Sequence, residues 1–352
     1  MLFSDNIGYS FYICQQIKEL TIMTNNSFSI RLREARLMMG LSMDKLVERT
    51  NGAITKQSIS RYEKGIMRPK RDALQAIAKA LNISEAYFNG TNLKIDVPML
   101  RTTSNGKLSE DELQALEAKL SFWAEQYLAK EKEAGFPTQF KNPIKGTRVS
   151  TLEDAIQASS LLREKWHCGD GPIASILRLL ERKGIMILAA TLPDYVFGMS
   201  TWADKKHPLM ILDFNSEKSS VEKLRFTAVH ELAHLLLLFP EDSPLKLEKR
   251  CDLFASFFLL PKLALIEELG SRKRELITLE EMIDIKELYG ASLAASIIAA
   301  RDYGIITTEY KRAWYAEHIE PNPREIGNGH YAFPETLGRE KRVNSIIKSM
   351  EE

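Results

Sequence analysis

Residues 221–239 read Val-Glu-Lys-Leu-Arg-Phe-Thr-Ala-Val-His-Glu-Leu-Ala-His-Leu-Leu-Leu-Leu-Phe and predict one long, largely buried helix. His230 and His234 are four residues apart within it, so both imidazoles lie on one helix face, about 5–6 Å apart. Both rings can then reach one Zn²⁺ at about 2.0 Å. Glu231 projects to the neighbouring side, where a carboxylate can act as a general base instead of a ligand. The stretch therefore predicts a zinc site with an adjacent base.

A catalytic zinc site needs a third protein ligand and one open coordination position. Glu248 lies on the next predicted helix, and we expect it to be that ligand. Asp252 follows one helical turn later, where its carboxylate can accept the second ring N–H of a ligating histidine. Cys251 is a rival ligand by residue type, but helix geometry disfavours it because Glu248 and Asp252 already define one face.

Two other interpretations of the His-Glu-x-x-His motif stay open. In the first, both histidines are satisfied by hydrogen bonds on an amphipathic helix and bind no metal. In the second, a zinc site is present but is structural or degenerate, with no open position. The downstream Glu-x-x-x-Asp spacing favours a catalytic zinc site over both alternatives.

Residues 28–91 form the second informative segment, a series of short amphipathic helices with a strong positive charge. Twelve lysines and arginines stand against six acids there, so the segment carries +6 although the whole chain carries only +1. The rest of the chain is therefore net acidic. This asymmetry indicates one module that meets an anion.

The helix predicted between Thr55 and Gly65 has the polarity of a recognition helix, whose first turn contacts base edges. Ile59 and Tyr62 are expected to face the core. Glutamine pairs with adenine, and arginine or lysine pairs with guanine. We therefore expect DNA contacts from Ser42, Thr55, Lys56, Gln57, Ser60 and Arg61. The alternative is a small helical bundle that binds proteins and has a solvated basic face.

This basic segment resembles the lambda-repressor/Cro-like (Xre-type) helix-turn-helix family. The matching residues are Leu41-Ser42, Leu46, Ser58-Ile-Ser-Arg-Tyr-Glu-Lys-Gly65, Pro69, Leu74, Ile77-Ala78 and Leu81. The family's small turn is enlarged here by Asn51-Gly52-Ala53. The resemblance implies sequence-specific binding to a double-stranded DNA operator, usually as a homodimer on a palindrome.

The second half of the chain resembles the ImmA/IrrE family of metallo-endopeptidases. The matching segments are residues 162–166, 171–173, 180–185, 197–200, 225–234 and 248–261. The commonest family form has Ala-Asn where this chain has Cys251-Asp252, and aspartate there is similar to thermolysin-like zincins. The resemblance implies a zinc-dependent endopeptidase with a zincin-like fold that cleaves a helix-turn-helix repressor.

Turn signals and apolar runs outline the elements of the second half. We expect helices at residues 152–166, 172–183, 221–239 and 247–260, and strands at 185–189, 197–203 and 208–214. Pro240 and Pro261 are expected to end the last two helices. A further amphipathic helix is expected at residues 108–132, helices dominate residues 278–315, and an irregular tail rich in proline and glycine follows at 320–337.

These patterns predict an α+β chain that is mostly helical. We expect a leader at residues 1–26, an all-α helix-turn-helix domain at 27–91 and a helical connector at 92–150. A zincin-like α+β peptidase domain with a small sheet is expected at 151–270, and a C-terminal helical region with an irregular tail at 271–352.

Composition narrows the class of protein. The 352 residues are 44% apolar and 27% charged, which excludes fibrous and wholly disordered chains. The net charge of +1 excludes a globally basic nucleic-acid binder. Three well-separated cysteines (Cys14, Cys168, Cys251) provide no disulfide framework, so a reducing compartment fits. No apolar run approaches the ~18 residues of a membrane span, and no secretory signal is recognised. We expect a cytoplasmic protein with no membrane partner.

The leading hypothesis from the sequence is a transcriptional regulator with zinc-dependent endopeptidase activity. Its substrate would be a repressor or antitoxin-like protein, or this chain itself. A second hypothesis is a DNA-binding repressor or antitoxin whose peptidase-like domain is a non-catalytic sensor or interaction module. A general degradative peptidase is a weaker third hypothesis, because a base-reading helix has no place in it.

Overall fold

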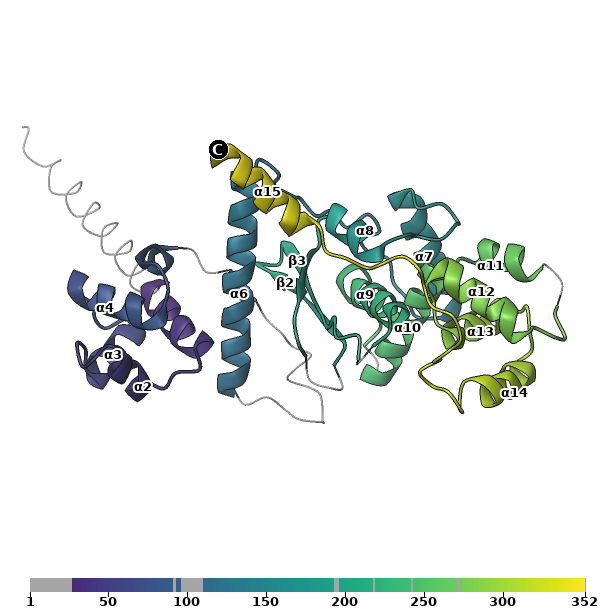
Figure 1. Cartoon of the computed structure of the whole chain (residues 1–352), viewed down its shortest axis with the longest axis horizontal. Helices are drawn as coiled ribbons and strands as arrows, with labels where there is room; N and C mark the ends of the chain where they lie inside the picture. The colour runs from purple at the N-terminus through teal and green to yellow at the C-terminus, as the bar shows by residue number, and fades with distance from the viewer. Residues whose placement is uncertain are drawn as a thin grey trace, which may run out of the picture. The chain divides into compact units, whose positions relative to one another are not determined.

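The computed structural model describes residues 27–90, 93–95, 110–192, 196–217, 219–241, 243–270 and 273–351. The chain divides into two compact units, Met1–Leu128 and Ala129–Glu352, each with its own apolar core (Figure 1). The leader expected at residues 1–26 lies outside the described residues.

The first unit is a bundle of short helices. They are a helix at residues 27–38, α2 (Met43–Arg49), α3 (Lys56–Glu63), α4 (Arg71–Leu81), the 3₁₀ helix η1 (Glu85–Asn89) and α6 (Glu110–Glu133), which spans the boundary between the units. Ser42 and Thr55 begin α2 and α3, and each hydroxyl accepts a backbone N–H of the first turn. These caps explain why both helices begin where the sequence predicts.

The core of the first unit comes from apolar residues at helical spacing. Leu32, Leu46, Ile59 and Ile77 are fully buried, from four different helices. Two partly buried ion pairs reinforce the packing: Arg36 donates to Glu63 at 2.6 and 2.9 Å, and Arg31 donates to both oxygens of Glu125 at 2.7 Å. The Arg36–Glu63 pair is bidentate, which fixes its orientation as well as adding energy, whereas Arg31 uses the single nitrogen Nη2 for both contacts.

The second unit contains a three-stranded sheet with the order β1-β3-β2. β1 (Met186–Ala189) is parallel to β3 (His207–Leu212), and β2 (Gly198–Ala203) is antiparallel to β3. Asp204 and Lys205, in the three-residue turn between β2 and β3, both have positive φ, and the N–H of Lys206 donates to the Ala203 carbonyl at 3.0 Å. Because β3 is the middle strand, β2 forms one edge of the sheet.

Helices cover this sheet and form the rest of the unit. They are α7 (Leu152–Trp166), α8 (Ile176–Arg182), α9 (Val221–Leu236), α10 (Pro244–Leu259), α11 (Lys262–Leu269), α12 (Leu279–Tyr289), α13 (Leu293–Asp302), α14 (Thr308–His318) and α15 (Arg339–Glu351). α9 packs on β2 and β3 and lies beside α10, which packs on α7 (Figure 1). The predicted mostly helical chain with a small sheet is confirmed.

Three predicted helix boundaries in this unit are wrong by three residues or more. α10 begins at Pro244 instead of Leu247, because a proline is well suited to the first position of a helix. α8 begins at Ile176 instead of Pro172, because Ser175 caps it and Glu335 accepts the N–H groups of Ile176 and Leu177. α9 ends at Leu236, four residues before the proline expected to end it. The reason is that Leu238 is extended and exchanges backbone hydrogen bonds with residues 147–149.

The tail at residues 320–337 is irregular, as predicted, but buried carboxylates hold it in place. Glu325 accepts the first N–H groups of α13, and Glu222 of α9 accepts the N–H of Tyr331. Glu335 pairs with Arg225 of α9 in a fully buried contact. The sequence did not predict α11 or α15, which follow Pro261 and this tail. No helix in the described part of the chain is long and apolar enough to span a membrane.

Candidate metal centre and nucleic-acid interface

Three predicted ligands converge where α9 lies beside α10. The Nε2 atoms of His230 and His234 are 3.3 Å apart. A carboxylate oxygen of Glu248 lies 3.0 Å from Nε2 of His230, and the other lies 3.6 Å from Nε2 of His234. Tetrahedral zinc with bonds of about 2.05 Å places neighbouring ligand atoms about 3.3 Å apart. The three side chains therefore fit the coordination geometry of zinc.

Asp252 orients the first of these imidazoles. Its Oδ1 lies 2.8 Å from Nδ1 of His230, on the opposite side of the ring from Glu248. This contact favours the tautomer that carries its proton on Nδ1, which leaves Nε2 to face the metal position. The sequence predicted this role for Asp252, and the structure places the residue where the role requires it.

The same contacts shift the acid–base properties of the cluster. Burial lowers the pKa of His230, but hydrogen bonds to Asp252 and Glu248 outweigh burial and raise it to about 9. Hydrogen bonds from His230 and His234 lower the pKa of Glu248 to about 2. A cation that binds Nε2 of His230 must therefore displace a proton at neutral pH.

Cys251 also lies within reach of the two histidines. His230, His234 and Cys251 offer ligand atoms within 4.8 Å of one another. The Cys251 thiol, however, lies 3.8 Å from Nδ1 of His234, the ring nitrogen that does not face Glu248. Burial raises the pKa of this thiol, which keeps it protonated and a weak ligand. Glu248 is therefore the better third ligand, and Cys251 packs behind the site.

Glu231 is almost completely buried beside the cluster, at 4% exposure. Ser200 on β2 donates a hydrogen bond of 2.7 Å to Oε2 of Glu231, so the sheet orients the carboxylate of the helix. Gly198 makes this approach possible, since a Cβ there would lie 2.6 Å from the Thr227 methyl group and 3.4 Å from the Glu231 side chain. Ser200 is not among the site residues predicted from the sequence. The signal in the sequence was Gly198, two residues earlier in the predicted strand, because a glycine in a strand permits a close approach to a neighbouring element.

Lys223 is a second residue that the sequence did not single out. It lies two turns before His230 on the same face of α9, with its amine 4.9 Å from the Phe197 ring and 5.6 Å from the Phe226 ring. Aromatic faces stabilise a cation in this position. Burial lowers the pKa of Lys223, and Asp252 of the cluster acts in the opposite direction.

The predicted DNA-reading side chains lie around the N-terminal half of α3. Lys56, Gln57 and Arg61 are exposed and Ser60 is half-buried, whereas Ile59 and Tyr62 are buried as predicted. Lys56 forms an exposed ion pair of 2.7 Å with Asp44. Exposed ion pairs of this kind contribute little and exchange readily for a phosphate.

Ser42 and Thr55 have a different role from the other predicted DNA contacts. Each hydroxyl accepts a backbone N–H as a helix N-cap, from Lys45 and Ser58 respectively. The Thr55 hydroxyl also lies 3.0 Å from the Ser58 hydroxyl. Both side chains therefore serve as helix caps, and their DNA contacts stay a prediction.

Comparison with protein families identifies a match in the first unit. Residues 32–88 match the Helix-turn-helix family. The segment is a helix-turn-helix domain. The match confirms the Xre-like assignment of this part of the chain and indicates a DNA-binding regulator. It ends before the candidate metal centre. No curated protein and no solved structure matches the chain.

Proposed function

We propose that this protein is a DNA-binding transcriptional regulator whose second unit is a zinc-dependent endopeptidase of the ImmA/IrrE type. One observation carries the enzymatic half: the Nε2 atoms of His230 and His234 and the carboxylate of Glu248 are spaced as tetrahedral zinc ligands, beside a buried Glu231. If the two histidines only formed hydrogen bonds, the buried Glu231 carboxylate, which Ser200 of β2 holds beside them, would have no role.

The chemistry follows from the groups in place. Zinc held by these ligands would supply a Lewis acid and a water of lowered pKa. Ser200 occupies Oε2 of Glu231, so the other oxygen is available to hold the proton that peptide hydrolysis transfers from water to the leaving amine. Asp252 keeps His230 in the ligating tautomer. The burial of Glu231 excludes competing water from this proton transfer.

The sheet edge offers a place for an extended substrate. β2 carries Ser200 beside Glu231, and within the described residues no strand pairs with its outer edge. A peptide added there as a further strand would gain main-chain hydrogen bonds and would run past the carboxylate. We propose a repressor or antitoxin-like protein as the substrate, or a segment of this chain itself, with the first unit bound to a palindromic operator as a homodimer.

The test uses the zinc-loaded full-length protein incubated with candidate repressors encoded beside it, with products identified by mass spectrometry. The Glu231→Gln variant should lose cleavage and keep operator binding, because the substitution removes the base and leaves the DNA-binding unit intact. Glu267→Gln, at an exposed position of α11, is the matched control and should cleave as the wild type does. Cleavage that survives Glu231→Gln would overturn the enzymatic half of the proposal.

A second candidate function is a DNA-binding repressor or antitoxin whose second unit is a non-catalytic sensor. The observation that favours it is the family match, which covers only the DNA-binding segment. Absence of zinc in metal analysis of the purified protein, together with operator binding, would support this candidate. Comparable cleavage of many unrelated proteins would instead support a general degradative peptidase.

A further inference from the structure

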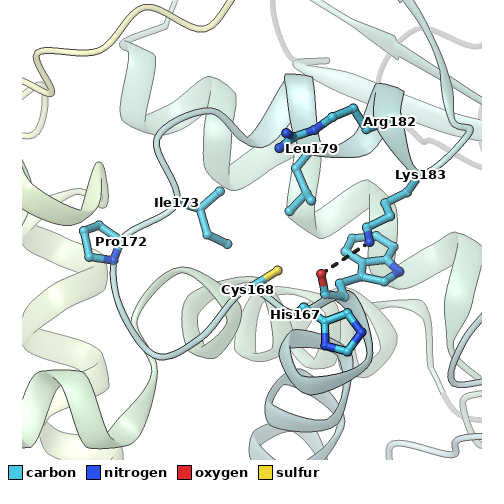
Figure 2. Close-up of a pocket in the computed structure, with 8 residues that line it drawn as sticks. His167, Cys168, Pro172, Ile173, Leu179, Arg182 and Lys183 are labelled. Carbon is cyan, nitrogen blue, oxygen red and sulfur yellow. Dashed lines mark hydrogen bonds between the residues drawn. The ribbon is translucent and has the colours of Figure 1, made fainter.

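A pocket of about 420 Å³ opens in the second unit, away from the candidate metal centre (Figure 2). It lies between the end of α7, the loop at residues 167–175 and the end of α8. Trp166 and Leu179 are buried in its wall, and Pro172 and Ile173 contribute further apolar surface. The volume is in the range of small-molecule sites, and the exposed lining is more polar than apolar.

The polar side chains that line this pocket are His167, Cys168, Arg182 and Lys183. Arg182 is exposed at its edge, and among the described residues its guanidinium has no hydrogen-bond or ion-pair partner. Lys183 donates to the Trp166 carbonyl at 3.3 Å, drawn as a dashed line in Figure 2, and its amine lies 5.5 Å from the Trp166 ring. None of the described residues that line the pocket is acidic.

The charged groups near the pocket act on the pKa of the Cys168 thiol. Burial raises the pKa of its thiol, whereas Arg163, Lys183 and Arg182 all act in the opposite direction. Arg182 and Lys183 line the pocket, whereas Arg163 lies outside the lining and is acted on by Asp170 of the same loop. A negatively charged ligand would therefore meet chiefly the two cations that line the pocket.

We propose that this pocket binds a small organic anion, a carboxylate carried on an apolar body. The carboxylate pairs with the guanidinium of Arg182 and with the amine of Lys183, and the apolar body packs against Trp166, Ile173 and Leu179. The planar fork of an arginine at the edge of a pocket is suited to bidentate recognition of a carboxylate.

The loop that lines the pocket is hydrogen-bonded directly to α9, and it is linked to α10 through Arg163 of α7. The carbonyl of Ile173 accepts from Arg225 of α9 at 2.8 Å, and Arg225 lies five residues before His230. Arg163 donates to the carbonyls of Gly169 on the loop and Phe258 on α10, at 2.8 and 2.7 Å. A ligand that shifts this loop changes hydrogen bonds to both helices. Regulation of cleavage through this link rests on the proposed function, whereas ligand binding does not.

The binding site is tested by titrating the full-length protein with benzoate and hexanoate. Isothermal calorimetry and tryptophan fluorescence monitor the binding. Both anions should bind saturably, and neutral benzamide and inorganic phosphate should not. The double variant Arg182→Ala/Lys183→Met should bind the anions at least about tenfold more weakly, because charge-assisted hydrogen bonds are lost. Arg312→Ala, an exposed cation on α14, is the matched control and should bind normally.

Three outcomes would overturn the proposal: no saturable binding of either carboxylate, equal binding of benzamide, or unchanged binding in the double variant. Hydrogen exchange with and without benzoate tests the link to the helices. Protection should change in residues 167–175 and in α9, and a change confined to the loop would overturn the link. The same titration on Glu231→Gln should give unaltered binding, which separates this proposal from the enzymatic one.

Discussion

Asp252 lies half-exposed at the rim of the histidine cluster, yet its contact with Nδ1 of His230 sets which nitrogen of the ring faces the metal position. Under the proposed zinc binding, Asp252 would act on metal affinity through His230 without touching the ion. The same holds for Ser200, which acts on Glu231 from the neighbouring strand. At the scale of single residues, the candidate site therefore depends on partners as much as on ligands.

Substitution of this partner should weaken zinc binding. We expect Asp252→Asn to reduce zinc affinity about 10–100-fold, because the amide no longer stabilises the ligating tautomer of His230. Competition with a chromophoric chelator measures the change. Asp284→Asn, at an exposed position of α12, is the control and should leave zinc affinity unaltered. Equal affinity of Asp252→Asn and wild type would contradict the assigned role.

Glu34 gives the first unit a pH dependence. Burial raises its pKa to about 7 from 4.5, Arg31 lowers it and Glu125 raises it further. A carboxyl with a raised folded-state pKa contributes stability that is full below pH 4.5 and is lost as the pH rises through 7.

At pH 8 the unit therefore carries the cost of a charged, partly buried Glu34. Glu34→Gln should raise the free energy of unfolding there by about 1–2 kcal/mol and flatten its pH dependence. The shift in pKa alone would give about 3 kcal/mol, which partial exposure reduces. The effect is measured by urea titration of the full chain at pH 5 and 8, with unfolding monitored through hydrogen exchange in residues 27–90. Glu48→Gln, exposed on α2, should change neither value.

Individual elements present the functional side chains, and α3 does so for DNA. Its buried residues fix it in the bundle while Gln57 and Arg61 stay exposed on the other side. Arg61→Ala should relax or abolish operator preference, at about 1–3 kcal/mol per lost base contact. Comparison of operator and non-specific DNA in a fluorescence anisotropy titration checks this. Lys79→Ala, a cation on α4, should lower the affinity for both DNAs by the same factor or not at all.

The contact between β2 and α9 depends on Gly198, which has no side chain. A Cβ at Gly198 would lie 2.6 Å from the Thr227 methyl group and 2.9 Å from the Leu212 side chain. Gly198→Ala should therefore destabilise the second unit by about 1–3 kcal/mol, as other overpacked cores are destabilised. Thermal unfolding followed by circular dichroism measures the loss. Gly171→Ala meets nothing within 4 Å and should be neutral, so equal losses would refute the packing argument.

The irregular tail connects elements across the whole second unit. Glu335 is buried against Arg225 and accepts the first N–H groups of α8, so one carboxylate joins the tail, α8 and α9. Glu335→Gln should cost about 3–5 kcal/mol, because it leaves the fully buried Arg225 guanidinium without a counter-charge. Thermal unfolding of the full-length protein measures this cost. Glu340→Gln breaks only an exposed, long contact with Lys130 and should cost less than about 1 kcal/mol.

The sequence by itself determined features that depend on residues close together in the chain. Helix period placed His230 and His234 on one face, and the N-caps of α2 and α3 followed from Ser42 and Thr55, because backbone hydrogen bonding over a few residues decides these features. The basic helix-turn-helix segment could be recognised for the same reason. Predicted strands lie within two residues of those observed.

Only the tertiary structure decided features that depend on residues far apart in the chain. Packing of α10 against α9 brought Glu248, and not Cys251, to the Nε2 side of both imidazoles, and packing of β2 brought Ser200 to Glu231. Pairing of Leu238 with the chain before α7 ended α9 early. Burial and long-range hydrogen bonds set these contacts, and their strength depends on neighbours that local sequence spacing does not specify.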